Sequence, residues 1–169
     1  MNKCIFLDRD GVLNKDFVDY VYSEDKLFIL PGVADALKVL KKRGYLLVII
    51  TNQSGIAKGL YTEDDMNTVH RIIQEKCSGV IDDIFFAPGH PSMSESLSRK
   101  PGSLMFERAI AKHNVDIDSS WMVGDKHRDL VPANKLGLKC IQVDHSDSTL
   151  ADFKVANLPA AVDIILSQI

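Results

Sequence analysis

The sequence predicts an α/β fold, a Rossmann-like three-layer sandwich in which helices cover both faces of a mostly parallel sheet. Short apolar segments rich in Val, Ile and Phe alternate along the chain with helical patterns. Strands that alternate with helices form right-handed βαβ units, and such units place neighbouring strands parallel. The 169 residues, 46% of them hydrophobic, provide one sizeable core, so we expect a single domain over residues 1–169.

Short apolar segments of this kind are expected to be strands buried on both faces. They are Cys4–Leu7, Leu46–Ile50, Ile84–Ala87, Trp121–Val123 and Cys140–Val143. Each is shorter than a typical helix and rich in residues that favour strands. The pattern therefore predicts a sheet built from these segments.

Helical patterns fill the intervals, over residues 33–43, 62–77, 101–113, 129–136 and 158–167. Thr62, followed by acidic residues, provides an N-cap and a favourable first turn. Pro101 is expected to open the third helix. Gly44 and Asn114 follow two predicted helix ends, where a left-handed residue commonly stops a helix. Pro132 fits its helix only if it lies in the first turn.

Composition narrows the classes of partner. The formal net charge is -3, and Lys and Arg form no long block, so no nucleic-acid partner is expected. The chain shows no signal segment and no apolar run of membrane-spanning length, which predicts a cytoplasmic protein without a membrane partner. Cys4, Cys77 and Cys140 lie far apart in apolar contexts typical of buried, reduced thiols. A small molecule is the expected partner.

Polar residues follow the predicted strands at the edge where parallel α/β sheets bind ligands, beyond the carboxyl ends of the strands. A sheet of this type would bring them together. They are Asp8 and Asp10 after the first strand, Thr51 and Asn52 after the second, Arg99 and Lys100 in the loop after the third, and Asp125 after the fourth.

This set of residues suits phosphoryl transfer. Several acids at one place repel each other unless a hard divalent cation such as Mg²⁺ lies between them. Lys100 and Arg99 supply positive charge for phosphate oxygens, and Thr51 supplies a hydrogen bond. Asp8 can attack phosphorus, while Asp10 can protonate the departing oxygen and later activate water.

Four segments, FLDRDGVLN, IITNQSG, SRKPG and MVGDKHRD, resemble in order and spacing the four motifs of the haloacid dehalogenase-like (HAD) phosphatases, over about residues 3–143. The resemblance implies the HAD fold and a phosphatase that acts through an aspartyl-phosphate on Asp8, with Asp10 as general acid and base. It further implies that Thr51 and Lys100 contact the transferring phosphoryl group. The carboxylates of Asp8 and Asp125 and the backbone carbonyl of Asp10 would hold Mg²⁺.

Within this family, DRDGVLN, TNQSGIAKG and RKPG resemble the branch of D-glycero-D-manno-heptose-1,7-bisphosphate 7-phosphatases and histidinol-phosphate phosphatases. The branch has a minimal cap, and here residues 14–30 and 87–98 are the segments that could cover the site. The resemblance implies a small phosphorylated sugar or related metabolite as partner, with the 7-phosphate of heptose 1,7-bisphosphate first. The alternative substrates are histidinol phosphate or a different small sugar phosphate. A further alternative is a catalytically silent binding protein.

Seven polar side chains close to the motifs are candidates for binding the sugar or its distal phosphate. They are Asp16, Tyr20, Asn52, Gln53, Ser54, Arg99 and Lys126. Polar loop residues beside a catalytic motif are the usual source of substrate contacts.

One segment departs from the branch. Its members commonly hold a structural zinc in the loop after the third strand, through a Cys-x-His pair and a Cys-x-Cys pair. Ala87, Gly89, Ser96 and Ser98 stand at these positions here, so we expect no structural zinc. Because Arg99 follows this loop, the departure bears on the identity of the substrate more than on the chemistry.

Overall fold

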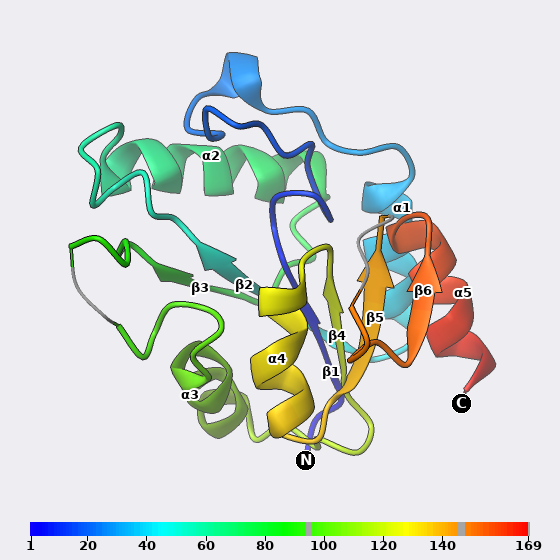
Figure 1. Cartoon of the computed structure of the whole chain (residues 1–169). Helices are drawn as coiled ribbons and strands as arrows, with labels where there is room; N and C mark the ends of the chain where they lie inside the picture. Colours follow the sequence, from blue (N-terminus) through cyan, green and yellow to red (C-terminus); the bar gives the residue numbers. More distant parts are fainter. Residues whose placement is uncertain (94–95, 145–147, 169) are drawn as a thin grey trace.

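A parallel sheet lies at the centre of the computed structural model, which describes residues 1–93, 96–144 and 148–168 (Figure 1). The order of its strands is β3-β2-β1-β4-β5-β6, and every pair is parallel. The strands are β1 (Cys4–Leu7), β2 (Leu46–Asn52), β3 (Asp83–Ala87), β4 (Trp121–Gly124), β5 (Lys139–Val143) and β6 (Phe153–Val155). The helices are α1 (Val33–Lys42), α2 (Glu63–Lys76), α3 (Leu104–His113), α4 (His127–Lys135) and α5 (Leu158–Ser167), with a short 3-10 turn at Glu24–Lys26.

The strand order reverses between β1 and β4. β1 pairs with β2 in the register Cys4 to Leu46, and with β4 in the register Ile5 to Trp121. Beyond the end of β1, the backbone N–H of Asp8 donates to the carbonyl of Val123 at 3.0 Å. Ligands of open α/β sheets bind at such a switch point. The fold therefore places the ends of β1 and β4, and the acids that follow them, at the expected edge.

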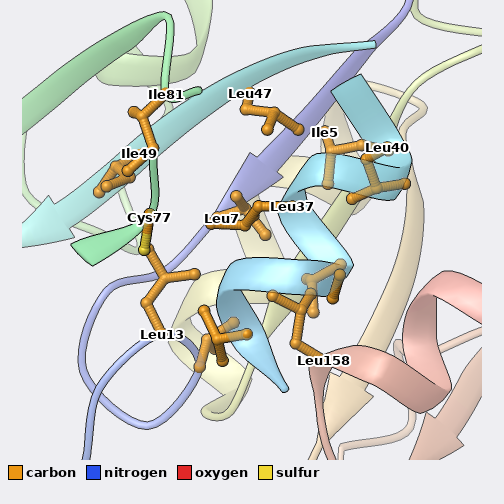
Figure 2. Close-up of a cluster of buried hydrophobic side chains, with 14 of the residues drawn as sticks. Ile5, Leu7, Leu13, Leu37, Leu40, Leu47, Ile49, Cys77, Ile81 and Leu158 are labelled. Atoms are coloured by element: carbon orange, nitrogen blue, oxygen red, sulfur yellow. The ribbon is translucent and has the colours of Figure 1, made fainter. Parts of the chain in front are cut away.

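Successive residues of each strand face opposite layers, because side chains alternate along a strand. Ile5 and Leu7 pack in the layer that contains α1, α2 and α5, and Phe6 packs against α3 and α4. Figure 2 shows the first layer, where Leu37 of α1 lies beside Leu7 and Leu158 of α5 belongs to the same cluster. Both faces are buried, which confirms the predicted three-layer sandwich.

The five predicted strands are confirmed, and β6 is an additional strand. It contains only Phe153–Val155, at the edge of the sheet and only partly buried. A three-residue edge strand is too short to produce an apolar run or an alternation in the sequence. The thiols of Cys4, Cys77 and Cys140 are buried and free, as predicted.

Two predicted helix starts are wrong. α3 begins at Leu104 instead of Pro101. α4 begins at His127, two residues before the predicted start, because the carboxylate of Asp129 accepts from the backbone N–H of Lys126 at 2.9 Å and so caps an earlier first turn. Pro132 consequently lies inside the helix instead of in its first turn, and its nitrogen cannot donate to the carbonyl one turn earlier.

The structure confirms a predicted helix start signal and a predicted helix stop signal. Thr62 caps α2 by accepting from the backbone N–H of Asp65 at 3.1 Å, and Asn114 ends α3 with a left-handed φ of 47°. Among the residues described, no helix has the length and apolar character that are needed to cross a membrane.

Candidate active site

Three buried carboxylates meet where the strand order reverses. Asp8 follows β1, Asp125 follows β4, and Asp129 lies in the first turn of α4. One carboxylate oxygen from each lies within 4.8 Å of the other two. Gly11 allows this approach, since its φ is +88° and a Cβ at this position would collide with the carboxylate of Asp125.

Lys100 reaches two of these acids from the loop after β3. Its Nζ lies 2.8 Å from Asp8 Oδ1 and 2.8 Å from Asp129 Oδ1, and it donates to the carbonyl of Ile50 at 2.7 Å. The side chain is only 1% exposed. Although burial opposes it, the charges of Asp129 and Asp8 raise the pKa of Lys100 above its ordinary value. Lys100 is therefore a fixed cation beside Asp8.

The acids carry more negative charge than Lys100 balances. Burial, reinforced by the charge of Asp129, raises the pKa of Asp8 to about 6 although Lys100 opposes the shift. Burial and the charges of Asp8 and Asp129 raise the pKa of Asp125 to about 8. A cluster of hard oxygen donors that repel one another fits Mg²⁺, which prefers carboxylate and carbonyl oxygens. Asp8, Asp125 and the carbonyl of Asp10 are thus suited to hold this ion.

Asp10 lies beside the acid cluster and has separate partners. Its carboxylate accepts from Arg9 Nε and Nη2, each at 3.0 Å, and from Asn14 Nδ2 at 3.0 Å. Although burial opposes it, Arg9 and Asn14 hold the pKa of Asp10 below its ordinary value. The Asp10 side chain is 20% exposed, so it remains accessible from the cavity described below.

Side-chain hydrogen bonds link the residues at the end of β2 to one another and to the loop that carries Lys100. The hydroxyl of buried Thr51 lies 2.9 Å from the side-chain amide of Gln53, which also meets the hydroxyl of Tyr61 at 2.7 Å. Asn52 accepts from the backbone N–H of Lys100 at 3.0 Å and donates to its carbonyl at 3.1 Å. Asn52 therefore fixes the loop that carries Lys100.

A cavity of about 310 Å³ opens over Asp8 and Asp10. All seven predicted substrate-binding residues line it, together with Asp8, Asp10 and Lys100; the seven are Asp16, Tyr20, Asn52, Gln53, Ser54, Arg99 and Lys126. Thr51 and Asp125 lie below its wall, where they are 1% and 7% exposed. The structure thus brings the predicted residues to one place.

Cations gather at the mouth of this cavity. Lys126 forms an ion pair with Asp16 and lies 3.5 Å from Asp125. Arg99 donates to the carbonyl of Gly89 at 3.2 Å, and partial burial together with the charge of Arg128 lowers its pKa. Within the described parts of the chain, neither Arg99 nor Arg128 forms an ion pair with a carboxylate. Two guanidinium groups that pair with no carboxylate of the described residues favour an anion at this point.

Sequence reasoning missed three groups of this site. Asp129 stands four residues after Asp125 in MVGDKHRD, and an acid at that spacing on a helix start was the available signal. Arg128 lies between them, and Arg9 lies between Asp8 and Asp10; both line the cavity. Charged residues inside a motif are ambiguous in sequence, because only packing shows which of them face the site.

The positions at which related enzymes are expected to hold zinc lie close together here, but their residues are not zinc ligands. A Cβ on Gly89 would lie 3.8 Å from the Cβ of Ser96, and the hydroxyls of Ser96 and Ser98 are 2.6 Å apart. Serine hydroxyls and an alanine do not supply the thiolates or imidazoles of a structural zinc site. The absence of zinc stays a prediction. Residues 94 and 95 of the covering segment lie outside the described residues.

An open parallel sheet with two Asp residues after β1, a buried lysine and two further acids defines the class of HAD-like hydrolases. Residues 97–166 match the family model described as HAD-hydrolase-like. The structure is similar to the crystal structure of D,D-heptose 1,7-bisphosphate phosphatase from B. bronchiseptica complexed with magnesium and phosphate. The TM-score is 0.90 and the identity 29%, over 99% of each chain.

Curated relatives identify the family. The D-glycero-beta-D-manno-heptose-1,7-bisphosphate 7-phosphatase of Haemophilus ducreyi is 40% identical over 146 residues, which cover 81% of this chain and 80% of the relative. The enzyme of the same name from Haemophilus influenzae is 42% identical over 138 residues, which cover 77% and 74%. The chain therefore belongs to the family of heptose-1,7-bisphosphate 7-phosphatases, within the HAD-like phosphatases. This confirms the family that the motifs predicted.

Proposed function

We propose that the chain is a Mg²⁺-dependent phosphatase that removes the 7-phosphate of D-glycero-D-manno-heptose 1,7-bisphosphate, with residues 1–169 acting as one catalytic domain. The observation that carries the proposal is the pairing of two features in one cavity. Asp8 with its Lys100 partner lines the cavity, and the guanidinium groups of Arg99 and Arg128 line the same cavity. The names of the relatives support the same substrate.

The chemistry begins with Asp8. A carboxylate oxygen of Asp8 attacks the phosphorus of the 7-phosphate, and the bond from phosphorus to the sugar oxygen breaks. In the substrate complex the negative charge of the bound phosphate favours the protonated form of Asp10 against the effect of Arg9, and Asp10 gives this proton to the leaving oxygen. A water molecule then attacks the phosphorus of the aspartyl-phosphate, Asp10 takes the proton of this water, and inorganic phosphate and free Asp8 result.

Other side chains hold charge and geometry in this sequence. Lys100 neutralises charge between Asp8 and the phosphoryl oxygens. The Thr51 hydroxyl turns from the Gln53 amide, 2.9 Å away, to donate to the same group. Asp8, Asp125 and the carbonyl of Asp10 would hold Mg²⁺, which supplies the positive charge that lets a phosphate approach these acids. Asp129 keeps Lys100 in place through their 2.8 Å ion pair.

Recognition of the second phosphate separates the candidate substrates. Arg99 and Arg128 carry positive charge at the mouth, and Lys126 adds a third cation. A bisphosphate brings an anion to this place, whereas histidinol phosphate brings an ammonium group that the cations repel. Asp16, Tyr20, Asn52, Gln53 and Ser54 supply polar groups for the sugar hydroxyls. The first substrate is therefore preferred over the second.

A substrate panel with a catalytic control tests the proposal. Phosphate release should be measured with heptose 1,7-bisphosphate, heptose 7-phosphate and histidinol phosphate, each with Mg²⁺ and with a chelator. We expect Mg²⁺-dependent release with the highest kcat/KM for the bisphosphate, and none from Asp8→Asn. A preference for histidinol phosphate would overturn the assigned substrate. Lack of release from every phosphate ester would leave the silent binding protein as the interpretation.

A further inference from the structure

Arg9 is a charged side chain buried within the protein, at 1% exposure. Its Nε and Nη2 donate to the two carboxylate oxygens of Asp10, and Nη2 also donates to the carbonyl of Val21 at 3.0 Å. Val21 belongs to residues 14–30, the segment that covers the site. A buried guanidinium is stable only when its donors are satisfied, so each contact contributes to its fixed position.

His70 of α2 completes this arrangement. Its Nε2 lies 3.3 Å from Arg9 Nη1, and its side chain is buried. Because a guanidinium has donors only, Nε2 of His70 must be the acceptor, which assigns the ring proton to Nδ1. Burial and the neighbouring charge of Arg9 lower the pKa of His70 to about 3, which keeps the imidazole neutral.

Gln53 meets the same guanidinium from the loop after β2. With its amide oxygen turned to Arg9, Gln53 accepts from Nη2 at 3.1 Å and Nη1 at 3.3 Å, while its amide nitrogen donates to Tyr61. Arg9 is thus held from three elements, of which only α2 lies remote from the cavity. Removal of the His70 acceptor would take from Arg9 Nη1 its partner on α2. The guanidinium would then be free to turn away from Asp10.

We propose that His70 is a positioning residue, whose neutral imidazole fixes the guanidinium of Arg9 and thereby the carboxylate of Asp10. Asp10 is then held where it meets the leaving oxygen. This inference rests on the proposed function, since it takes Asp10 as the proton donor. His70 itself is not one of the residues that line the cavity.

The test uses leaving groups of different acidity. An alkoxide leaving group needs the proton of Asp10, whereas the nitrophenolate of p-nitrophenyl phosphate departs with little help. The quantity to compare is kcat/KM, because it reports the steps up to the departure of the leaving group. His70→Leu should lower kcat/KM for the sugar bisphosphate by about 10-fold, and that for p-nitrophenyl phosphate by less than about twofold.

Two further variants separate positioning from packing. His70→Gln offers an amide oxygen to Arg9 and should restore most of the lost kcat/KM. Val69→Ala, at the fully buried neighbouring position of α2, should lower the melting temperature through a cavity and leave the ratio of the two kcat/KM values unchanged. Equal losses for both substrates in His70→Leu would overturn the proposal, as would a ratio shift of the same size in Val69→Ala.

An Asp10→Asn variant distinguishes a failure of the positioning role of His70 from a failure of the proton-donor role of Asp10. If Asp10→Asn loses the sugar phosphate selectively and His70→Leu does not, the positioning role of His70 is refuted while the proposed function stands. If Asp10→Asn shows no such selectivity, the assigned role of Asp10 fails and the inference fails with it. Nitrogen NMR of the His70 ring should show a neutral Nδ1–H form at neutral pH, and an Nε2–H form would contradict the proposed contact.

Discussion

Replacing Asp125 with Asn should stabilise the metal-free protein at alkaline pH. Oxygens of Asp8, Asp125 and Asp129 lie within 4.8 Å of one another, where two like charges repel by about 3.5 kcal/mol at an effective dielectric constant of about 20. Asp125 meets two such charges, and Lys126 at 3.5 Å offsets about 4.7 kcal/mol of the repulsion. The charge terms alone should therefore let the neutral amide raise the free energy of unfolding by about 2 kcal/mol, and relief from burying a charge adds to this.

The gain should depend on pH in a defined direction. The pKa of Asp125 is raised to about 8 by burial and by Asp8 and Asp129. Below about pH 4 the carboxyl is protonated in both the folded and the unfolded state and has no effect. Between about pH 4 and pH 8 only the unfolded chain ionises, so wild-type stability falls as the pH rises. The advantage of Asp125→Asn should therefore grow over this range and be complete near its upper end.

Urea unfolding of chelator-treated protein at both ends of this pH range measures the effect. Asp35→Asn is the matched control, because Asp35 is 86% exposed and lies far from the acid cluster. Added Mg²⁺ at about 100 times its Kd should stabilise the wild type by about 2.7 kcal/mol, and at the same concentration it should stabilise Asp125→Asn much less. Destabilisation of the metal-free variant at alkaline pH would show that Asp125 is not repelled by its neighbours, and an equal response to Mg²⁺ would show that Asp125 does not hold the ion.

The remaining predictions concern proton transfer, the distal phosphate and zinc. Asp10→Asn should lower kcat/KM for alkyl phosphates by about 10²-fold and for p-nitrophenyl phosphate much less; equal losses would remove Asp10 from the leaving oxygen. Arg128→Met should raise KM about 10-fold for a sugar bisphosphate and leave KM for a monophosphate unchanged, and a parallel rise for both would contradict its contact with the distal phosphate. Elemental analysis of the purified protein should find far less than one zinc per chain, and stoichiometric zinc would disprove the expectation.

Short-range signals explain which parts of the fold could be predicted. The strand Cys4–Leu7 is a continuous apolar run, and Thr62 stands before a run of acids, so local chemistry identifies both. The start of α4 was misplaced because Asp129 serves as a capping residue there and not as the first residue of the helix. Strand β6 lies at the edge, with two partly buried residues on either side of one exposed residue, and its pairing with β5 depends on contacts that its own sequence does not reveal.

The candidate site also contains residues that the sequence predicts and contacts that it does not. The residues predicted as catalytic or metal-binding lie in short motifs at strand ends or in the loop after a strand, and the parallel topology brings them to one edge of the sheet. They are Asp8, Asp10, Thr51, Lys100 and Asp125. The network around Arg9 could not be predicted, because its partner on α2 lies 61 residues away in the sequence. Which side chain satisfies a buried charge depends on how the helix packs, and neither residue type nor local spacing carries that information.

The proposed mechanism requires that Asp8 becomes phosphorylated during turnover. The active protein should be mixed with Mg²⁺ and substrate, quenched within one turnover, and treated with borohydride, which reduces an aspartyl-phosphate to homoserine. Peptide mass spectrometry should then find homoserine at position 8 in the wild type, and no modified residue in Asp8→Asn. An active enzyme that yields no reduced residue at position 8, or one modified at another carboxylate, would contradict the account.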